Sequence, residues 1–207
     1  MQWCHETGVS SVGDSGCCVL VSVFHPTGTG VPAKVPQRVL AVVVRGLLGD
    51  AERHRSDISD VVFVSPSCVM GRVAALECFL QNACNARGVA DCGGVRALNL
   101  AVRRCSNDPA LAAQGCVALT RLAQSDAPRS SFVKVACVET VLIVLGQHAT
   151  DPVVQARALA LLSTLVESRR MQLDFRKLCG AAVLQASLTE TLRNTVVVRG
   201  ILDACSR

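Results

Sequence analysis

Residues 107–124 read NDPALAAQGCVALTRLAQ and residues 150–167 read TDPVVQARALALLSTLVE, so two similar stretches lie 43 residues apart. In each stretch an Asp-Pro pair precedes a run rich in Ala and Leu. Aspartate is a good N-cap, because its carboxylate can accept a hydrogen bond from an otherwise unpaired helical N–H. Proline is tolerated directly after the cap, since the N–H that it lacks has no partner within the helix. The two stretches therefore predict two equivalent helices with the same start.

The start signal and the apolar spacing extend beyond these two stretches. Ser65-Pro66 stands one period earlier, and Asn194-Thr195 stands one period later without the proline. Apolar residues then recur at helical spacing, which predicts the buried face of each helix. In chain order, the predicted core positions are Cys68, Arg72, Ala75, Leu76 and Phe79; Leu111, Gly115, Ala118, Leu119 and Leu122; Val154, Ala158, Leu161, Leu162 and Leu165; and Val197, Ile201, Ala204 and Cys205. Arg72 departs from the apolar pattern.

Two further helices are predicted upstream of each capped helix. The nearer one is marked by Val95, Leu98 and Val102, then by Val138, Val141 and Leu145, then by Ala181, Leu184 and Leu188. The farther, shorter one is marked by Val89, Phe132 and Phe175 and by Cys92, Val135 and Leu178. Gly93-Gly94 and Gly180 stand at the break between them, where glycine can end a helix. The period thus predicts three helices in about 43 residues.

This pattern resembles the armadillo repeat over residues 65–207, as about three and a half copies. The stretch GGVRALNLAVRRCSNDPALAAQGCVALTRLA carries the family's Gly-Gly start, polar turn and Ala/Leu-rich third helix. Several copies at one period are strong evidence for repeats, since one such unit cannot bury its apolar face alone. The resemblance implies an all-α fold, a right-handed α-solenoid of three-helix armadillo-like repeats.

The chain outside this array is harder to interpret. Residues 1–35 mix Gly, Ser, Thr and Pro, and we expect them to be poorly structured. Residues 36–64 read as a degenerate first repeat, with a helix at Val39–Leu48 followed by a polar insertion at 49–60. The sequence stops at Arg207, inside the fourth capped helix. Because solenoids need polar end caps, this suggests either a fragment or an end open to contact with another chain.

The spacing of the cysteines and the length of the apolar runs indicate in which compartment the protein is expected. None of the 12 cysteines forms a C-x-x-C pair, so the usual zinc and redox spacings are missing. Cys116, Cys137, Cys179 and Cys205 lie in apolar helical stretches, where free thiols pack as small hydrophobic groups. We expect a reducing environment, no metal and no cofactor. The longest early apolar run, 17–24, is too short to span a membrane. These features predict a cytoplasmic protein, or alternatively a nuclear one, that is not secreted.

No motif in the sequence supports catalysis. Residues 13–16, GDSG, are similar to a protease nucleophile segment, but the His and Asp that must precede the nucleophile do not fit in front of them. Residues 28–33 imitate a dinucleotide-binding loop, but Pro26 and Pro32 disrupt the turn and the helix start. No nucleophile, base and orienting group come together. The sequence predicts a protein that is not an enzyme.

The armadillo resemblance implies a binding groove lined by the third helices. Carried onto this chain, the groove residues are Gln114, Val117, Arg121, Gln124, Arg157, Ala160, Thr164 and Arg207. The Trp and Asn with which nuclear-import adaptors of this family line the groove are absent: their places are held by Ala74, Val117, Ala160 and Asp203 and by Cys78, Arg121, Thr164 and Arg207. Binding of basic import signals is therefore not expected. The resemblance implies a non-enzymatic scaffold that binds a protein or peptide segment along the groove.

The charge distribution favours an acidic partner. Residues 84–207 carry 15 basic and 9 acidic side chains, whereas residues 1–83 are nearly balanced. A basic surface attracts acidic ligands at long range. An RNA-binding helical repeat is an alternative, although only 3% of the residues are aromatic and could stack on bases. A chaperone cofactor of the armadillo type is another alternative. Arg103-Arg104 and Arg169-Arg170 are interpreted as helix-end charges that favour the helix dipole.

Overall fold

The computed structural model describes residues 34–53, 66–125, 129–187 and 196–206, and every regular element in these ranges is an α-helix. The all-α prediction is therefore confirmed for the described residues. The helices are α3 (Gln37–Arg53), α4 (Pro66–Phe79), α5 (Ala83–Asp91), α6 (Gly94–Arg104), α7 (Pro109–Gln124), α8 (Arg129–Lys134), α9 (Cys137–Gln147), α10 (Pro152–Leu165), α11 (Arg169–Lys177), α12 (Gly180–Ser187) and α14 (Val196–Ser206). None of these helices is long and apolar enough to cross a lipid bilayer.

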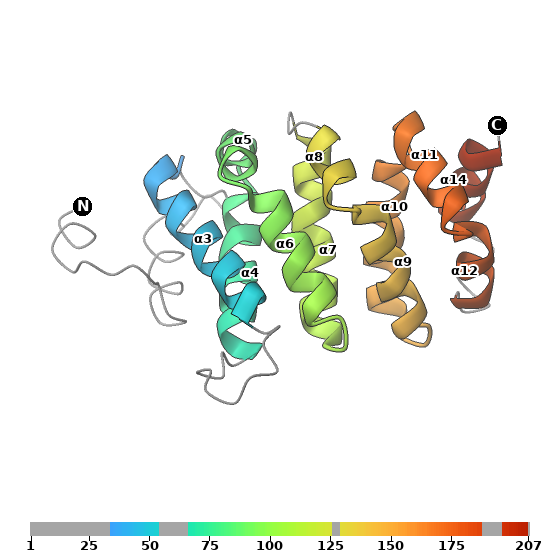
Figure 1. Ribbon diagram of the computed structural model, residues 1–207, viewed down its shortest axis with the longest axis horizontal. Coiled ribbons are helices and arrows are strands. Elements are labelled where there is room, and N and C mark those ends of the chain that lie inside the picture. Colours follow the sequence, from blue (N-terminus) through green and yellow to red (C-terminus); the bar gives the residue numbers. More distant parts are fainter. Residues whose placement is uncertain (1–33, 54–65, 126–128, 188–195, 207) are drawn as a thin grey trace, which may run out of the picture.

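The helices follow one another in a row from the N-terminal to the C-terminal end (Figure 1). Helices α4, α7, α10 and α14 pack side by side in that order, and α3, α6, α9 and α12 form a second layer against them. The short helices α5, α8 and α11 lie along one edge of the row in Figure 1. Contacts of α3 with α4, α6 with α7 and α9 with α10 join the two layers, and the apolar core lies between them.

The predicted helix starts are confirmed where the structure describes them. The Asp108 carboxylate accepts hydrogen bonds from the N–H groups of Ala110 and Leu111 at 2.9 and 3.2 Å. Asp151 does the same with Val153 and Val154 at 2.9 and 3.1 Å. In each case proline follows as the first residue of the helix. The other two predicted caps, at 65 and 194, lie outside the described residues.

The break between the first two helices of each predicted unit has one backbone geometry. Gly93, Ala136 and Cys179 have φ values of 86°, 52° and 52° and lie 43 residues apart. The N–H of each donates to the carbonyl three residues back, at 3.0, 3.1 and 3.1 Å respectively. The third break was predicted at Gly180, which is one residue too late. Position 180 requires glycine for a steric reason and not for its φ, because a Cβ there would lie 2.3 Å from the ring of Phe175.

Most predicted core positions are buried. The exceptions are Val197, Ala181 and Leu178, which are exposed. In α14 the buried residues are Val198, Ile201 and Cys205, so the helix turns Val197 toward solvent. Ala204 is half-buried, and so are Cys92 and Val135, which mark the short helix of the pattern. Positions 68 and 188 lie outside the residues whose side chains are described.

Helix α3 is longer than predicted. It spans Gln37–Arg53, so the first residues of the predicted polar insertion at 49–60 are helical. Arg72, the departure from the apolar pattern, is nevertheless buried in α4 at 3% exposure. A Cβ at Gly46 of α3 would lie 1.4 Å from an Arg72 guanidinium nitrogen. The absence of a side chain at Gly46 therefore makes room for this arginine between the two helices. Residues 1–33 and 54–65 of the predicted N-terminal segments lie outside the described residues.

The cysteine prediction is confirmed at three of its four positions. Cys116, Cys137 and Cys205 are buried, whereas Cys179 is exposed because it occupies the left-handed break before α12. Burial raises the pKa of the Cys116 thiol to about 12, and it raises the pKa of Cys137 further above its ordinary value. Both thiols are therefore protonated at neutral pH and pack as apolar groups.

Candidate peptide-binding face

Seven of the eight residues predicted to line a groove belong to α7 and α10, which lie side by side between α4 and α14. Gln124, Arg157 and Ala160 are exposed, and Gln114, Val117 and Arg121 are half-buried. These six residues lie on the two central helices of one layer, on the sides not used for the core. We call this set the α7–α10 face.

Two predicted groove residues do not join the α7–α10 face. Thr164 is buried at 8% exposure, and its hydroxyl donates to the Ala160 carbonyl one turn back at 3.0 Å. Because the hydroxyl donates within its own helix, the buried side chain does not leave its donor unpaired, and it presents little surface to a ligand. Thr164 was predicted on the exposed side of its helix, and the structure places it on the buried side instead. Arg207 lies outside the described residues.

Arg121 is held by a residue that the sequence pattern did not single out. Its guanidinium forms an ion pair with the Glu77 carboxylate of α4 at 3.2 Å, with both side chains partly exposed. The neighbouring Cys78 thiol is affected by the same pair: burial and the Glu77 charge raise its pKa, and Arg121 opposes this. Glu77 corresponds in the period to Thr120 and Ser163, so no repeated signal marked it. The pair joins α4 to α7 at the border of the face.

The face also contains a polar atom with no partner in the described part of the chain. The Gln114 side-chain oxygen is buried and accepts no hydrogen bond there. Buried polar groups are usually satisfied, so such an atom is a candidate for contact with a ligand or water. Arg157, at the corresponding position of α10, is exposed and lies near enough to Cys116 to lower its pKa against the larger effect of burial. The face therefore contains an unpaired amide oxygen on α7 and an exposed cation at the corresponding position of α10.

Small side chains separate these polar groups. Ala74, Val117 and Ala160 occupy corresponding positions on α4, α7 and α10, and none of them is buried. A row of small residues leaves room for the main chain of an extended ligand, with charged and amide groups on both sides of it. Chemically, the arrangement suits recognition of a polypeptide by hydrogen bonds and charge.

The described residues show shifted pKa values only at thiols, and every shift is upward. A raised thiol pKa lowers the fraction of nucleophilic thiolate. Comparison of the chain with protein-family models, with curated proteins and with solved structures found no match in any of the three.

Proposed function

We propose that the chain is a protein-binding scaffold of the armadillo type, a right-handed α-solenoid whose α7–α10 face holds an extended acidic segment of a partner. One observation carries the proposal: α4, α7, α10 and α14 contact one another consecutively, and α7 and α10 carry small, amide and basic side chains that are not buried. Helices stacked in this way are how solenoids generate extended binding surfaces. Arg157 supplies the positive charge, since Arg121 is already paired with Glu77.

The most informative substitution is at Ala160, which is exposed in the middle of the face. A tryptophan there fills the row of small residues, whereas a tryptophan at Ala186 on α12 adds the same bulk to the other layer. Arg157→Glu tests the charge. It is a cleaner probe than Arg121→Glu, because reversing Arg121 would also set a carboxylate beside Glu77.

The experiment is a selection from a displayed library of random peptides, followed by titration of the selected peptides. We expect acidic peptides that bind the native chain and the Ala186→Trp variant equally and bind Ala160→Trp and Arg157→Glu at least about tenfold more weakly. Affinity should fall as salt is raised, since exposed charges are screened. Equal binding to Ala160→Trp and Ala186→Trp would show that peptides do not bind at the α7–α10 face. Retention of single-stranded RNA instead of peptides would favour the nucleic-acid alternative.

The proposed scaffold would work in the reducing cytoplasm or nucleus. The eight cysteines that the structure describes are all unpaired thiols, and four of them are buried. Buried free thiols suit a compartment in which disulfides are rare.

A further inference from the structure

The short helices α8 and α11 carry an excess of positive charge. Helix α8 (RSSFVK) has two basic residues and no acidic one, and α11 (RRMQLDFRK) has four basic residues and one acidic one. Arg129 pairs with Glu167 at 3.0 Å, and Arg170 lies 3.9 Å from Asp174. Arg176 donates to the Cys205 carbonyl and so keeps its full charge.

Besides Arg176, three exposed cations of these helices make no ion pair within the described residues: Lys134, Arg169 and Lys177. The prediction that Arg169-Arg170 favour the helix dipole is wrong, because they are the first two residues of α11 and not the last. Cations at a helix N-terminus oppose the dipole. Helix α11 therefore gains nothing from Arg169 and Arg170, whereas Lys177 in its last turn favours the dipole.

A cleft of about 300 Å³ lies between the α8–α9 segment and α11. Its apolar lining includes Phe132, Val133, Val138, Met171 and Leu178. Leu178 is 39% exposed, one of the few large apolar side chains in the described residues that face solvent. This volume is at the small end for ligand pockets and suits one or two side chains better than a large cofactor.

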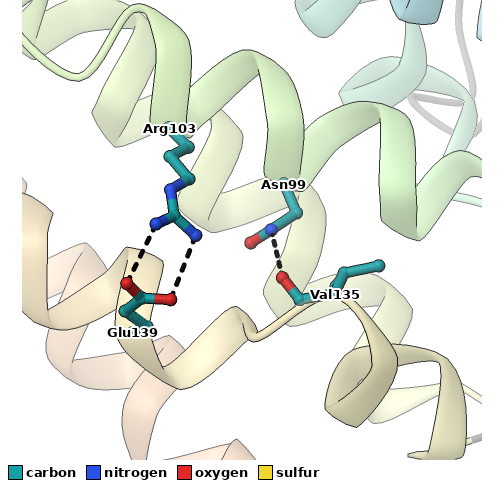
Figure 2. Close-up of polar contacts among 4 residues, drawn as sticks. All are labelled: Asn99, Arg103, Val135 and Glu139. Atoms are coloured by element: carbon teal, nitrogen blue, oxygen red, sulfur yellow. Dashed lines mark hydrogen bonds and ion pairs between the residues drawn. The ribbon is translucent and has the colours of Figure 1, made fainter. Parts of the chain in front are cut away.

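Each acidic residue at the cleft has an arginine beside it. Glu139 receives two hydrogen bonds from the Arg103 guanidinium, at 3.0 and 2.9 Å, as Figure 2 shows. Asp174 has Arg170 beside it. Lys177, which lines the cleft, has no such partner, and Lys134 follows directly after the lining residue Val133. The unbalanced charge around the apolar cleft is thus positive.

We propose that this cleft is a second binding site, which takes an acidic protein segment carrying a large apolar side chain. The apolar side chain would enter between Val133, Met171 and Leu178, and flanking carboxylates would meet Lys177, Lys134 and Arg169. The site uses helices other than those of the α7–α10 face, so it does not depend on the function proposed for that face.

The test uses three fluorescent 12-residue peptides and the full chain, with binding followed by fluorescence anisotropy at low salt. The first peptide has Asp and Glu on both sides of a Leu-Phe pair; the second has Ser in place of Leu-Phe; the third keeps Leu-Phe but has Lys in place of the acids. We expect the first to bind at least about tenfold more tightly than either of the others. Its affinity should fall at least about tenfold in Lys177→Glu and in Leu178→Asp.

The matched control is Arg87→Glu on α5, the short helix at the other end of the row, where an exposed arginine undergoes the same reversal of charge. It should change the affinity less than about twofold. Thermal unfolding checks that each variant is folded. If Lys177→Glu or Leu178→Asp does not fold, Lys134→Glu is tested in its place. The proposal is overturned if no peptide binds, if the Ser peptide binds as well as the Leu-Phe peptide, or if Arg87→Glu weakens binding as much as Lys177→Glu. Displacement of the peptide by single-stranded RNA, with the same dependence on Lys177, would assign the cleft to nucleic acid and also overturn it.

Discussion

Ala136 and Cys179 are the only non-glycine residues with a positive φ, 52° in each, in the part of the chain that the structure describes. The left-handed conformation costs a residue with a Cβ about 1–2 kcal/mol, because the Cβ approaches the following carbonyl oxygen. Gly93 holds the corresponding position before α6 without this cost. The same turn is therefore made once by glycine, which accepts a positive φ, and twice by residues for which a positive φ is unfavourable.

Ala136→Gly should raise the free energy of unfolding by about 0.5–1 kcal/mol, since it relieves the left-handed strain but adds some chain entropy to the unfolded state. Gly93→Ala is the matched control and should lower it by about 1 kcal/mol through the backbone alone, because nothing lies within 4 Å of a Cβ placed there. Urea denaturation of the two variants measures both effects. A loss of stability in Ala136→Gly would show that the turn is not strained.

At the scale of the element, Gly115 decides how closely α7 approaches α6. A Cβ at Gly115 would lie 2.1 Å from a methyl carbon of Val102, far inside van der Waals contact. Glycine in the middle of a helix is unfavourable by itself. The residue is thus explained by packing between helices and not by helix formation.

Gly115→Ala should cost about 1–3 kcal/mol of stability, because an overpacked core must move apart. In a Val102→Ala background the same change should cost nothing or stabilise the protein, since alanine is the better helix former by about 1 kcal/mol. A double-mutant cycle by urea denaturation gives the coupling between the two positions. Additive effects would mean that the close approach of α6 and α7 at this point is not what excludes a side chain.

At the scale of the whole molecule, polar contacts join neighbouring helices of one layer. On α6, Asn99 donates to the Val135 carbonyl at 2.7 Å, and one turn later Arg103 binds Glu139 of α9 (Figure 2). Further along, a ring nitrogen of His148 lies 2.6 Å from the Ser106 carbonyl. Asn99 is 4% exposed, whereas the Arg103 and Glu139 side chains are 42% and 38% exposed. The two contacts that α6 makes with the α8–α9 segment therefore differ in their burial.

This difference in burial predicts unequal costs of substitution. Asn99→Ala leaves the Val135 carbonyl without its partner and should lower the free energy of unfolding by about 1–3 kcal/mol. Arg103→Ala removes an ion pair that water screens and should cost less than about 1 kcal/mol. Thermal and urea unfolding of the two variants at one salt concentration give the comparison. A larger effect for Arg103 than for Asn99 would contradict this account of how α6 is joined to the α8–α9 segment.

Several features of this protein could be predicted from sequence because they depend on neighbours along the chain. The caps at Asp108 and Asp151 bond N–H groups two and three residues away, and the apolar spacing around Leu119 and Leu162 reflects the helical period. The candidate face was predicted in outline for the same reason, since Arg157 and Ala160 lie on the side of α10 opposite its buried residues. These signals act within one helix and need no knowledge of its neighbours.

The sequence by itself therefore determined that the described chain is helical, where two helices begin, and which side of most helices is buried. Only the tertiary structure decided that Arg121 meets Glu77, that Thr164 is buried, that Val198 replaces Val197 in the core, and that a cleft opens beside α11. Each of these depends on the distance and rotation between two packed helices. Those two quantities are set by how side chains from distant segments fit together, and no short stretch of sequence encodes them.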